Sequence, residues 1–160
     1  MQNKDKNIIE NTDDYYMLVA LKEAKKALKK DEVPIGAILV KDNEIVAKGF
    51  NQKNESRNSF KHAEMIVLKK YQKKIKDWHF NDLTLYTTLE PCPMCAGAIL
   101  NFRVGKVVFG AYDKKAGSCG TVIDLLDKKE FNHRPMHYGG VCEKECSEIL
   151  TNYFKEKRKK

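Results

Sequence analysis

The chain has 160 residues, of which 42% are hydrophobic and 32% charged, and its formal net charge is +8. This length suits a single domain over residues 1–160, and the composition excludes a disordered arm. No apolar run approaches the ~20 residues of a membrane span, and the polar start MQNKDKNIIENTDD lacks the apolar stretch of a secretory signal. We therefore expect a cytoplasmic protein without a membrane contact, whose five cysteines stay reduced.

Much of the excess positive charge lies in the C-terminal run KEKRKK, residues 155–160. Taken alone, such a run indicates a solvated surface. Beside a site for nucleobases, the same charge would suit the phosphates of a nucleic acid. Charge by itself does not decide between these interpretations.

Helix and strand patterns alternate along the chain without an internal repeat or a linker. We predict helices over 12–30, 62–74, 94–101, 121–126 and 141–157. We predict strands over 36–40, 44–49, 83–88, 104–110 and, less strongly because of Pro135, 133–138. The first two strands form a hairpin, and the strand-helix-strand order over 83–110 indicates a parallel crossover. The pattern predicts an α/β fold, a three-layer α/β/α sandwich with a mixed, mostly parallel five-stranded sheet.

The most informative residues are His62 and Glu64 in HAE, and Cys92 and Cys95 in PCPMC. One imidazole and two thiols give three metal ligands. A structural zinc takes four protein ligands, whereas a catalytic zinc keeps one position open for water. We therefore predict that His62, Cys92 and Cys95 hold one Zn²⁺ per subunit. Glu64, which is not a ligand in this scheme, would move the protons of that water.

Local geometry sets the conditions for such a site. Pro93 has no N–H and fits the first position of a helix, which places Cys92 at the cap and Cys95 on the first turn. Both thiols then lie near the positive end of the helix dipole, which favours thiolates. His62 and Glu64 are two residues apart, a spacing that does not share a helix face. They can converge only if His62 precedes the regular helix.

With HAE and PCPMC, the sequence resembles the zinc-dependent cytidine and deoxycytidylate deaminase superfamily, whose signature is H-x-E followed by P-C-x-x-C. Segments over most of the chain resemble, within it, the bacterial tRNA-specific adenosine deaminases: EVPIGAILV (32–40), GFN (49–51), HAEMIVL (62–68), LYTTLEPCPMCAGAIL (85–100), VVFGAYDKKAGSCG (107–120) and FNHRP (131–135). The resemblance implies a cytidine deaminase-like fold and a homodimer. The implied reaction is hydrolysis of the wobble adenosine of a tRNA anticodon to inosine.

The resemblance also implies a set of residues that contact the anticodon loop, namely Asn51, Ala63, Asp113, Asn132, Tyr153 and Phe154. The first would hydrogen-bond the target base, and the second would contact the base edge through its backbone. The aromatic pair is Tyr-Phe here, where the family has Phe-Phe. Plainer explanations exist, since Asn51 could simply end the hairpin and the aromatic pair could pack a last helical turn.

The remaining cysteines and histidines allow other interpretations. A structural zinc would need a distant fourth ligand, Cys119, Cys142 or Cys146, and would leave Glu64 without a role. Otherwise the last two have the spacing of buried helix positions, and Cys119 fits a Gly-rich turn. We interpret His79 and His137 as surface or packing residues, whereas His133 either faces substrate or is structural.

Two other functions remain open at this stage. Superfamily members share the zinc site, so the chain could deaminate a small substrate such as guanine, cytosine, or a free nucleoside or nucleotide. It could also be a non-catalytic RNA-binding module stabilised by zinc. That module would require a closed shell of four protein ligands.

Overall fold

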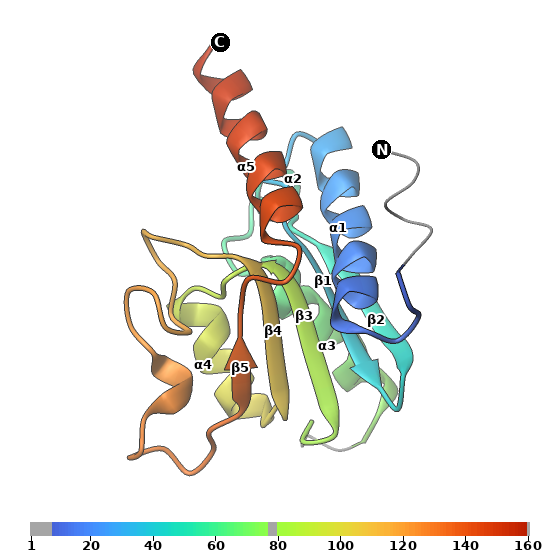
Figure 1. Cartoon of the computed structure of the whole chain (residues 1–160), viewed down its shortest axis with the longest axis vertical. Helices are drawn as coiled ribbons and strands as arrows, with labels where there is room; N and C mark the ends of the chain where they lie inside the picture. Colours follow the sequence, from blue (N-terminus) through green and yellow to red (C-terminus); the bar gives the residue numbers. More distant parts are fainter. Residues whose placement is uncertain (1–7, 77–79, 160) are drawn as a thin grey trace.

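A five-stranded sheet lies between two layers of helices in the computed structural model, which describes residues 8–76 and 80–159 (Figure 1). The strands are β1 (Gly36–Lys41), β2 (Glu44–Phe50), β3 (Leu83–Leu89), β4 (Lys106–Ala111) and β5 (Met136–Tyr138). The helices are α1 (Asp13–Lys29), α2 (Lys53–Ser56), α3 (Ala63–Lys74), α4 (Pro93–Phe102) and α5 (Glu143–Arg158). Among the described residues, no helix has the length and apolar character needed to cross a lipid bilayer.

The sheet is mixed, with strand order β2-β1-β3-β4-β5. Strand β1 runs antiparallel to both β2 and β3, whereas β3, β4 and β5 are parallel to one another. The β1–β2 hairpin turns at Asp42 and Asn43, whose φ angles of 49° and 65° suit a two-residue turn. The predicted hairpin, parallel crossover and mostly parallel mixed sheet are therefore confirmed.

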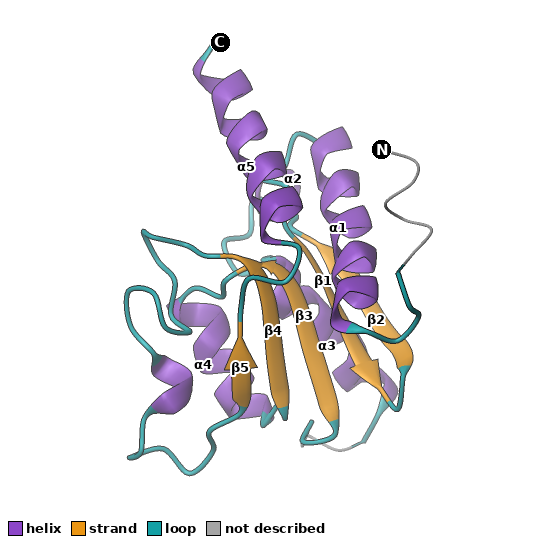
Figure 2. Cartoon of the chain, in the orientation of Figure 1, coloured by secondary structure: helices purple, strands orange, loops and turns teal. Residues whose placement is uncertain are grey.

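The two faces of the sheet carry separate apolar clusters. Figure 2 shows the helices that cover the sheet. Successive side chains of a strand point to opposite faces, so Leu85 of β3 belongs to one cluster and Tyr86 to the other. Leu85 shares its cluster with Val67 of α3 and Ile99 of α4. Tyr86 shares its cluster with Met17 of α1, and α5 adds to the same side. The predicted three-layer arrangement is confirmed, with α1 and α5 on one face and α3 and α4 on the other.

Two local predictions differ from the structure. The helix predicted over 121–126 is wrong, because this stretch is a loop that ends in a 3₁₀ turn at Leu125–Asp127. The last strand is shorter than the predicted 133–138 range and begins only after Pro135, which has no N–H to donate to a ladder. The short helix α2 was not predicted. All three differences lie at the ends or outside of the long periodic elements.

The parallel strands end at one edge of the sheet, from which α5 extends outward (Figure 1). The chain leaves β3 at this edge and enters α4 through the segment Glu90-Pro91-Cys92. The N-terminus of α3 belongs to the same region, because its capping residue His62 meets the start of α4. The fold therefore brings the HAE and PCPMC motifs together at the carboxyl edge of β3.

Candidate metal centre

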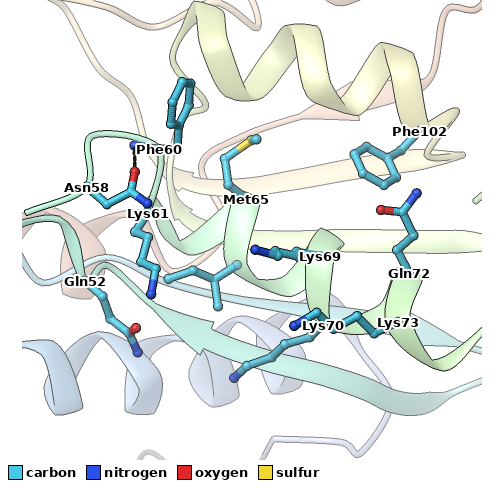
Figure 3. A pocket seen from close by; sticks show the side chains of 11 residues that line it. Gln52, Asn58, Phe60, Lys61, Met65, Lys69, Lys70, Gln72, Lys73 and Phe102 are labelled. Atoms are coloured by element: carbon cyan, nitrogen blue, oxygen red, sulfur yellow. Dashed lines mark hydrogen bonds between the residues drawn. The ribbon is translucent and has the colours of Figure 1, made fainter. Parts of the chain in front are cut away.

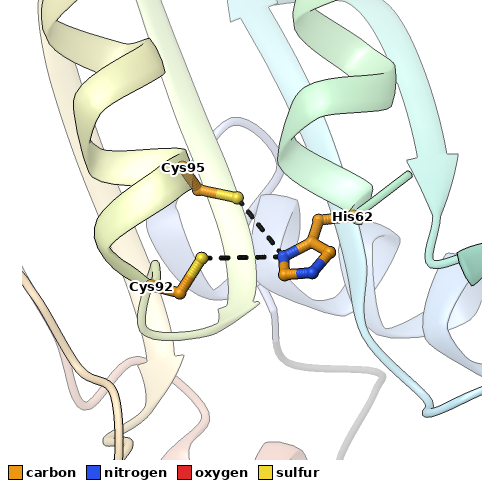
Figure 4. A group of neighbouring side chains, drawn as sticks. All are labelled: His62, Cys92 and Cys95. Carbon is orange, nitrogen blue, oxygen red and sulfur yellow. Dashed lines mark hydrogen bonds between the residues drawn. The ribbon is translucent and has the colours of Figure 1, made fainter. Parts of the chain in front are cut away.

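His62, Cys92 and Cys95 converge between the first turns of α3 and α4 (Figure 4). The Nδ1 atom of His62 lies 3.6 Å from the Sγ atom of each cysteine. His62 is the N-cap of α3 with an extended backbone (φ −75°, ψ 154°), so it precedes the regular helix. Cys92 is the N-cap of α4 and Pro93 its first residue. The local geometry expected from both motifs is confirmed.

The three ligand atoms fit a zinc ion. Zn–N bonds of ~2.0–2.1 Å and Zn–S bonds of ~2.3 Å, meeting at a tetrahedral angle, place nitrogen and sulfur about 3.6 Å apart. The distances from His62 Nδ1 match this value for both sulfurs. The side chains are thus arranged as they would be around a shared ion, and His62, Cys92 and Cys95 could hold a zinc.

The two thiols differ in their affinity for a proton. A hydrogen bond with the Cys95 thiol, aided by His62, lowers the pKa of Cys92 to about 4 although partial burial opposes the shift. The same hydrogen bond, together with burial and the nearby Glu64 carboxylate, raises the pKa of Cys95. One thiolate is therefore available at neutral pH before a metal arrives, and metal binding would release the second proton.

Glu64 lies directly beside these ligand atoms, and its side chain is buried in the protein. Its side chain is only 4% exposed, and its Oε2 atom accepts a hydrogen bond from the Cys95 thiol at 3.3 Å. The other carboxylate oxygen, Oε1, accepts a hydrogen bond from the Thr87 hydroxyl at 2.9 Å. Burial raises the pKa of Glu64, against the opposing effect of His62 and of hydrogen bonds to the carboxylate. A carboxyl group of this kind is suited to receiving and returning a proton.

The described residues do not supply the fourth ligand that a structural zinc needs. The group of side chains that could hold a metal there consists of His62, Cys92 and Cys95 alone. Cys119 is buried in the loop after β4, while Cys142 is the N-cap of α5 and Cys146 is buried along that helix. A group of only three candidate ligands among the described residues speaks against both the structural zinc and the closed shell of a purely RNA-binding module.

The other histidines take no part in this group. His133 Nε2 donates a hydrogen bond to the carbonyl of Val104 at 2.6 Å, which favours the structural interpretation. His137 pairs with Asp124, with 2.9 Å between Nε2 and Oδ1. His79 lies outside the described residues. The histidine that the sequence pattern singled out is thus also the one that the structure brings to the cysteines.

Asn51 and Ala63 are the two expected base-contacting residues nearest to the metal ligands in sequence. Asn51 is buried just after β2, and its backbone N–H is held by the carbonyl of Ile35 at 3.0 Å. Ala63 is buried as the first residue of α3, next to His62. Both therefore lie at the ends of elements, in positions fixed by the backbone.

Asp113 and Asn132 occupy two different loops. One oxygen of the Asp113 carboxylate accepts hydrogen bonds from the backbone N–H groups of Lys115 and Ala116, so this side chain also builds its own turn. Asn132 lines a small hollow with Asn101 and Arg103 at the far end of α4. The structure does not show Asn132 in contact with the metal ligands, which belong to the first turn of that helix.

Tyr153 and Phe154 lie on α5 and behave differently. The Tyr153 hydroxyl donates to the carbonyl of Asp31 at 3.4 Å, which ties the helix to the end of α1. Phe154 is exposed and lines a shallow basic hollow with Lys115 and Arg158. Tyr153 thus has a contact with the end of α1, and Phe154 is accessible to a ligand.

A groove runs along α3 beside the candidate centre (Figure 3). Its apolar part includes Phe60, two residues before His62, together with Met65 and Phe102. Lysines from the same helix border it. Phe60 is 67% exposed, which is unusual for a large aromatic side chain next to a buried site.

Two buried glutamates that the sequence analysis missed hold the loops around the centre. The Glu32 carboxylate accepts the backbone N–H groups of Asn54 and Glu55, and so caps α2 in place of Gln52, whose side chain makes no capping bond. The Glu90 carboxylate accepts the N–H groups of Asp113, Cys119 and Thr121 and the Thr121 hydroxyl. An acidic residue directly after the apolar strand 83–89 was the available signal for Glu90, but its partners are distant in sequence.

We expect the Glu90→Gln substitution to lower the free energy of unfolding by about 1–3 kcal/mol, because an amide cannot accept all the hydrogen bonds of the carboxylate and leaves buried donors unpaired. Urea denaturation with saturating zinc measures the change. Glu130→Gln is the control, since Glu130 is an exposed residue of the same loop region. Identical denaturation midpoints for the two variants would contradict the anchoring role.

The donor set fits a zinc site, and the family match that follows gives the class of the molecule as a zinc-binding deaminase. The sequence pattern of the cytidine and deoxycytidylate deaminase zinc-binding region matches residues 10–111. The match includes the whole sheet except β5, as well as all three candidate ligands and Glu64.

A tRNA-specific adenosine deaminase of Bacillus subtilis (strain 168) is 50% identical over 148 residues, which cover 92% of each chain. A solved structure from a study of A-to-I editing by tRNA:A34 deaminases has a TM-score of 0.81 and 37% identity, covering 85% of this chain and 99% of that one. A guanine deaminase of Nitrosomonas europaea, with a TM-score of 0.72 and 20% identity over 88% and 83% of the two chains, shares the fold. The chain belongs to the cytidine and deoxycytidylate deaminase family, in the group of the tRNA-specific adenosine deaminases.

Proposed function

We propose that this chain is an enzyme that hydrolytically deaminates adenosine to inosine at the wobble position of a tRNA anticodon. The observation that carries the proposal is the buried Glu64 carboxylate beside three metal ligands, at 3.3 Å from the Cys95 sulfur. A buried acid next to an incomplete ligand set suits a hydrolase better than a structural zinc. The near full-length similarity to the Bacillus subtilis protein supports the choice of substrate.

His62, Cys92 and Cys95 would hold the zinc. When bound, the ion supplies the Lewis acidity that makes water nucleophilic near neutral pH. Glu64 takes a proton from the attacking water, so that an oxygen–carbon bond forms at C6 of adenine. Glu64 then delivers this proton to the ring nitrogen N1, takes the remaining proton of the oxygen now bonded to C6, and passes it to the amino group, so that the C6–N bond breaks and ammonia is released. Such proton transfers contribute ~10²–10⁴-fold to a rate.

The base would be held by groups at the ends of elements around the centre. Asn51 would hydrogen-bond the adenine, and Ala63 would contact its edge through the backbone. Asp113, Asn132, Tyr153 and Phe154 would face the anticodon-loop nucleotides. A loop nucleotide suits this site, because its base can leave the stack at little cost. The net charge of +8 supports a polyanionic substrate.

Incubation of the zinc-loaded protein with tRNA carrying a wobble adenosine, and separately with guanine, cytosine and free nucleosides, tests the proposal. We expect inosine in the tRNA at the wobble position and ammonia in equal amount. Ammonia released only from the small substrates would make the chain a small-molecule deaminase. RNA binding without any product would favour the non-catalytic alternative.

We also propose that residues 1–160 form one deaminase domain, that the enzyme works in the cytoplasm where its tRNA substrate is found, and that it acts as a homodimer. The groove with Phe60 and Met65 supports the homodimer, because apolar surface beside an active site is stabilised by a covering partner. No membrane contact is part of this proposal.

Substitution of Phe60 tests whether the groove is the interface of the homodimer. Sedimentation equilibrium is expected to give twice the 18.4 kDa mass of the chain, and Phe60→Asp is expected to shift the population toward monomer, because a charge in an apolar interface is left unpaired. Ile9→Asp is the matched control, since Ile9 is likewise an exposed apolar residue, at 74%. A monomeric wild type, or a Phe60→Asp dimer as tight as the control, would refute this assignment.

A further inference from the structure

Thr87 is the residue that contacts Glu64 from the sheet. It is a fully buried residue of β3, paired with Ala37 of β1 on one side and with Phe109 of β4 on the other. Its position is therefore set by two neighbouring strands in the centre of the sheet. Its hydroxyl oxygen lies 2.9 Å from Oε1 of Glu64 and 3.2 Å from the carbonyl oxygen of Leu89.

The hydroxyl group fixes a side chain that would otherwise rotate. Glu64 is the second residue of α3, and its carboxylate reaches away from the helix to the centre. Oε2 accepts from the Cys95 thiol, a donor that zinc binding would remove, whereas Oε1 accepts from Thr87, a donor that does not depend on the metal. Thr87 is therefore the partner that can orient the carboxylate during the reaction. A proton acceptor held by a fixed donor needs less reorganisation before the reaction.

The Thr87 hydroxyl lies within hydrogen-bond distance of two acceptors. A hydroxyl has one hydrogen to donate and lone pairs with which to accept. Oε1 of Glu64 is the nearer acceptor, at 2.9 Å, and the carbonyl oxygen of Leu89 lies at 3.2 Å. Glu64 is therefore the nearer partner of this buried hydroxyl.

We propose that Thr87 is a positioning residue for the reaction, and that its hydroxyl orients the Glu64 carboxyl group through the hydrogen bond to Oε1. The inference rests on the function proposed above, in which Glu64 moves the protons. Thr87 itself touches neither the substrate nor the metal ligands in this scheme. An apolar residue of the same shape would fill the space and leave Glu64 Oε1 without this partner.

The neighbouring Thr88 provides a matched control. It is equally buried but faces the opposite side of β3, where its hydroxyl oxygen accepts the backbone N–H of Gly36 at 3.1 Å. Thr88→Val therefore also removes a buried hydrogen bond of a threonine in the same strand, but it leaves Glu64 untouched. Any effect of a general loss of stability should appear in this control as well.

The test compares Thr87→Val, Thr87→Ser and Thr88→Val in steady-state kinetics with tRNA. We expect Thr87→Val to lower kcat about ten- to hundredfold with KM within about twofold of wild type, because orientation of a reacting group changes the chemical step. Thr87→Ser keeps the hydroxyl and should recover most of kcat, and Thr88→Val should retain it. Equal kcat values for Thr87→Val and wild type, or equal losses in Thr87→Val and Thr88→Val, would overturn the proposal.

A crystal structure of metal-free Thr87→Val gives a second readout that does not depend on activity. We expect the Glu64 carboxylate to leave its position, whereas an unchanged carboxylate would refute the orienting role. The proposed function is tested separately: a wild-type protein that makes no inosine in tRNA would refute it. In that case the position of Glu64 in the variant crystals would still test the orienting role of Thr87.

Discussion

Glu64→Gln is expected to lower the rate of deamination by at least ~10²–10⁴-fold while zinc stays bound. Glutamine has nearly the same shape and can still accept the hydrogen bond of Thr87, but it cannot take a proton from water. The metal ligands are untouched. Single-turnover measurement of inosine formation in tRNA, with zinc content determined on the same samples, checks both parts of this expectation.

Glu23→Gln is the matched control for this experiment. Glu23 is 4% exposed, as is Glu64, but it lies on α1 and pairs with Lys26 at 2.7 Å. The same change of a buried carboxylate to an amide should leave deamination at the wild-type rate. A Glu64→Gln enzyme that kept activity within about tenfold of wild type would remove the proposed proton transfer. A variant that lost its zinc instead would show that Glu64 supports the ion.

Much of the centre could be predicted because its geometry is local. Pro93 determines where α4 begins, and that alone places Cys92 at the cap and Cys95 one turn on. The spacing of His62 and Glu64 required that the histidine precede its helix, and its extended backbone meets that requirement. The hairpin turn at Asp42 and Asn43 is local in the same sense. Site geometry that depends on residues close together in the chain can therefore be predicted from the sequence.

The parts that could not be predicted depend on partners far apart in the chain. Residues 121–126 have a helical pattern, but the Thr121 N–H and hydroxyl bind the Glu90 carboxylate, which lies thirty-one residues earlier, and the segment remains a loop. Helix α2 is too short to show a period, and Glu32 supplies its cap from outside. Both are tertiary hydrogen bonds that override local preference.

Thr87 combines a feature that the sequence predicts with one that it does not. The alternation of β3 predicts that Thr87 and Thr88 point to opposite faces, and the structure has one bound to Glu64 and the other to Gly36. No sequence rule says which buried carboxylate a threonine will meet. The sheet order, which places β3 between β1 and β4, decides this. Positioning residues of this kind emerge from topology and not from motifs.

The second large effect is expected at Cys92. Replacing Cys92 by alanine leaves only His62 and Cys95 as ligands, and we expect the zinc content to fall from one ion per chain to nearly none, with activity lost in parallel. Loss of a residue that only hydrogen-bonds a metal ligand lowers metal affinity by ~10–100-fold. Loss of the ligand Cys92 itself should lower the zinc affinity by more than this. The thiol of Cys92 is also the one whose pKa is lowered, to about 4, so the variant removes the thiolate that is present before the metal arrives.

Cys142→Ala is a control that removes the same side chain from a similar place in another helix. Cys142 is also a half-buried cysteine at the N-cap of a helix, α5, and it lies outside the group that could hold the metal. After dialysis against a chelator and reloading with zinc, elemental analysis should find one ion per chain in wild type and in Cys142→Ala, and almost none in Cys92→Ala. Because both variants lose the same thiol from the same kind of position, a difference between them is attributable to coordination. Full zinc binding by Cys92→Ala would require a different ligand set and, with it, a different reason for Glu64 to lie buried beside Cys95.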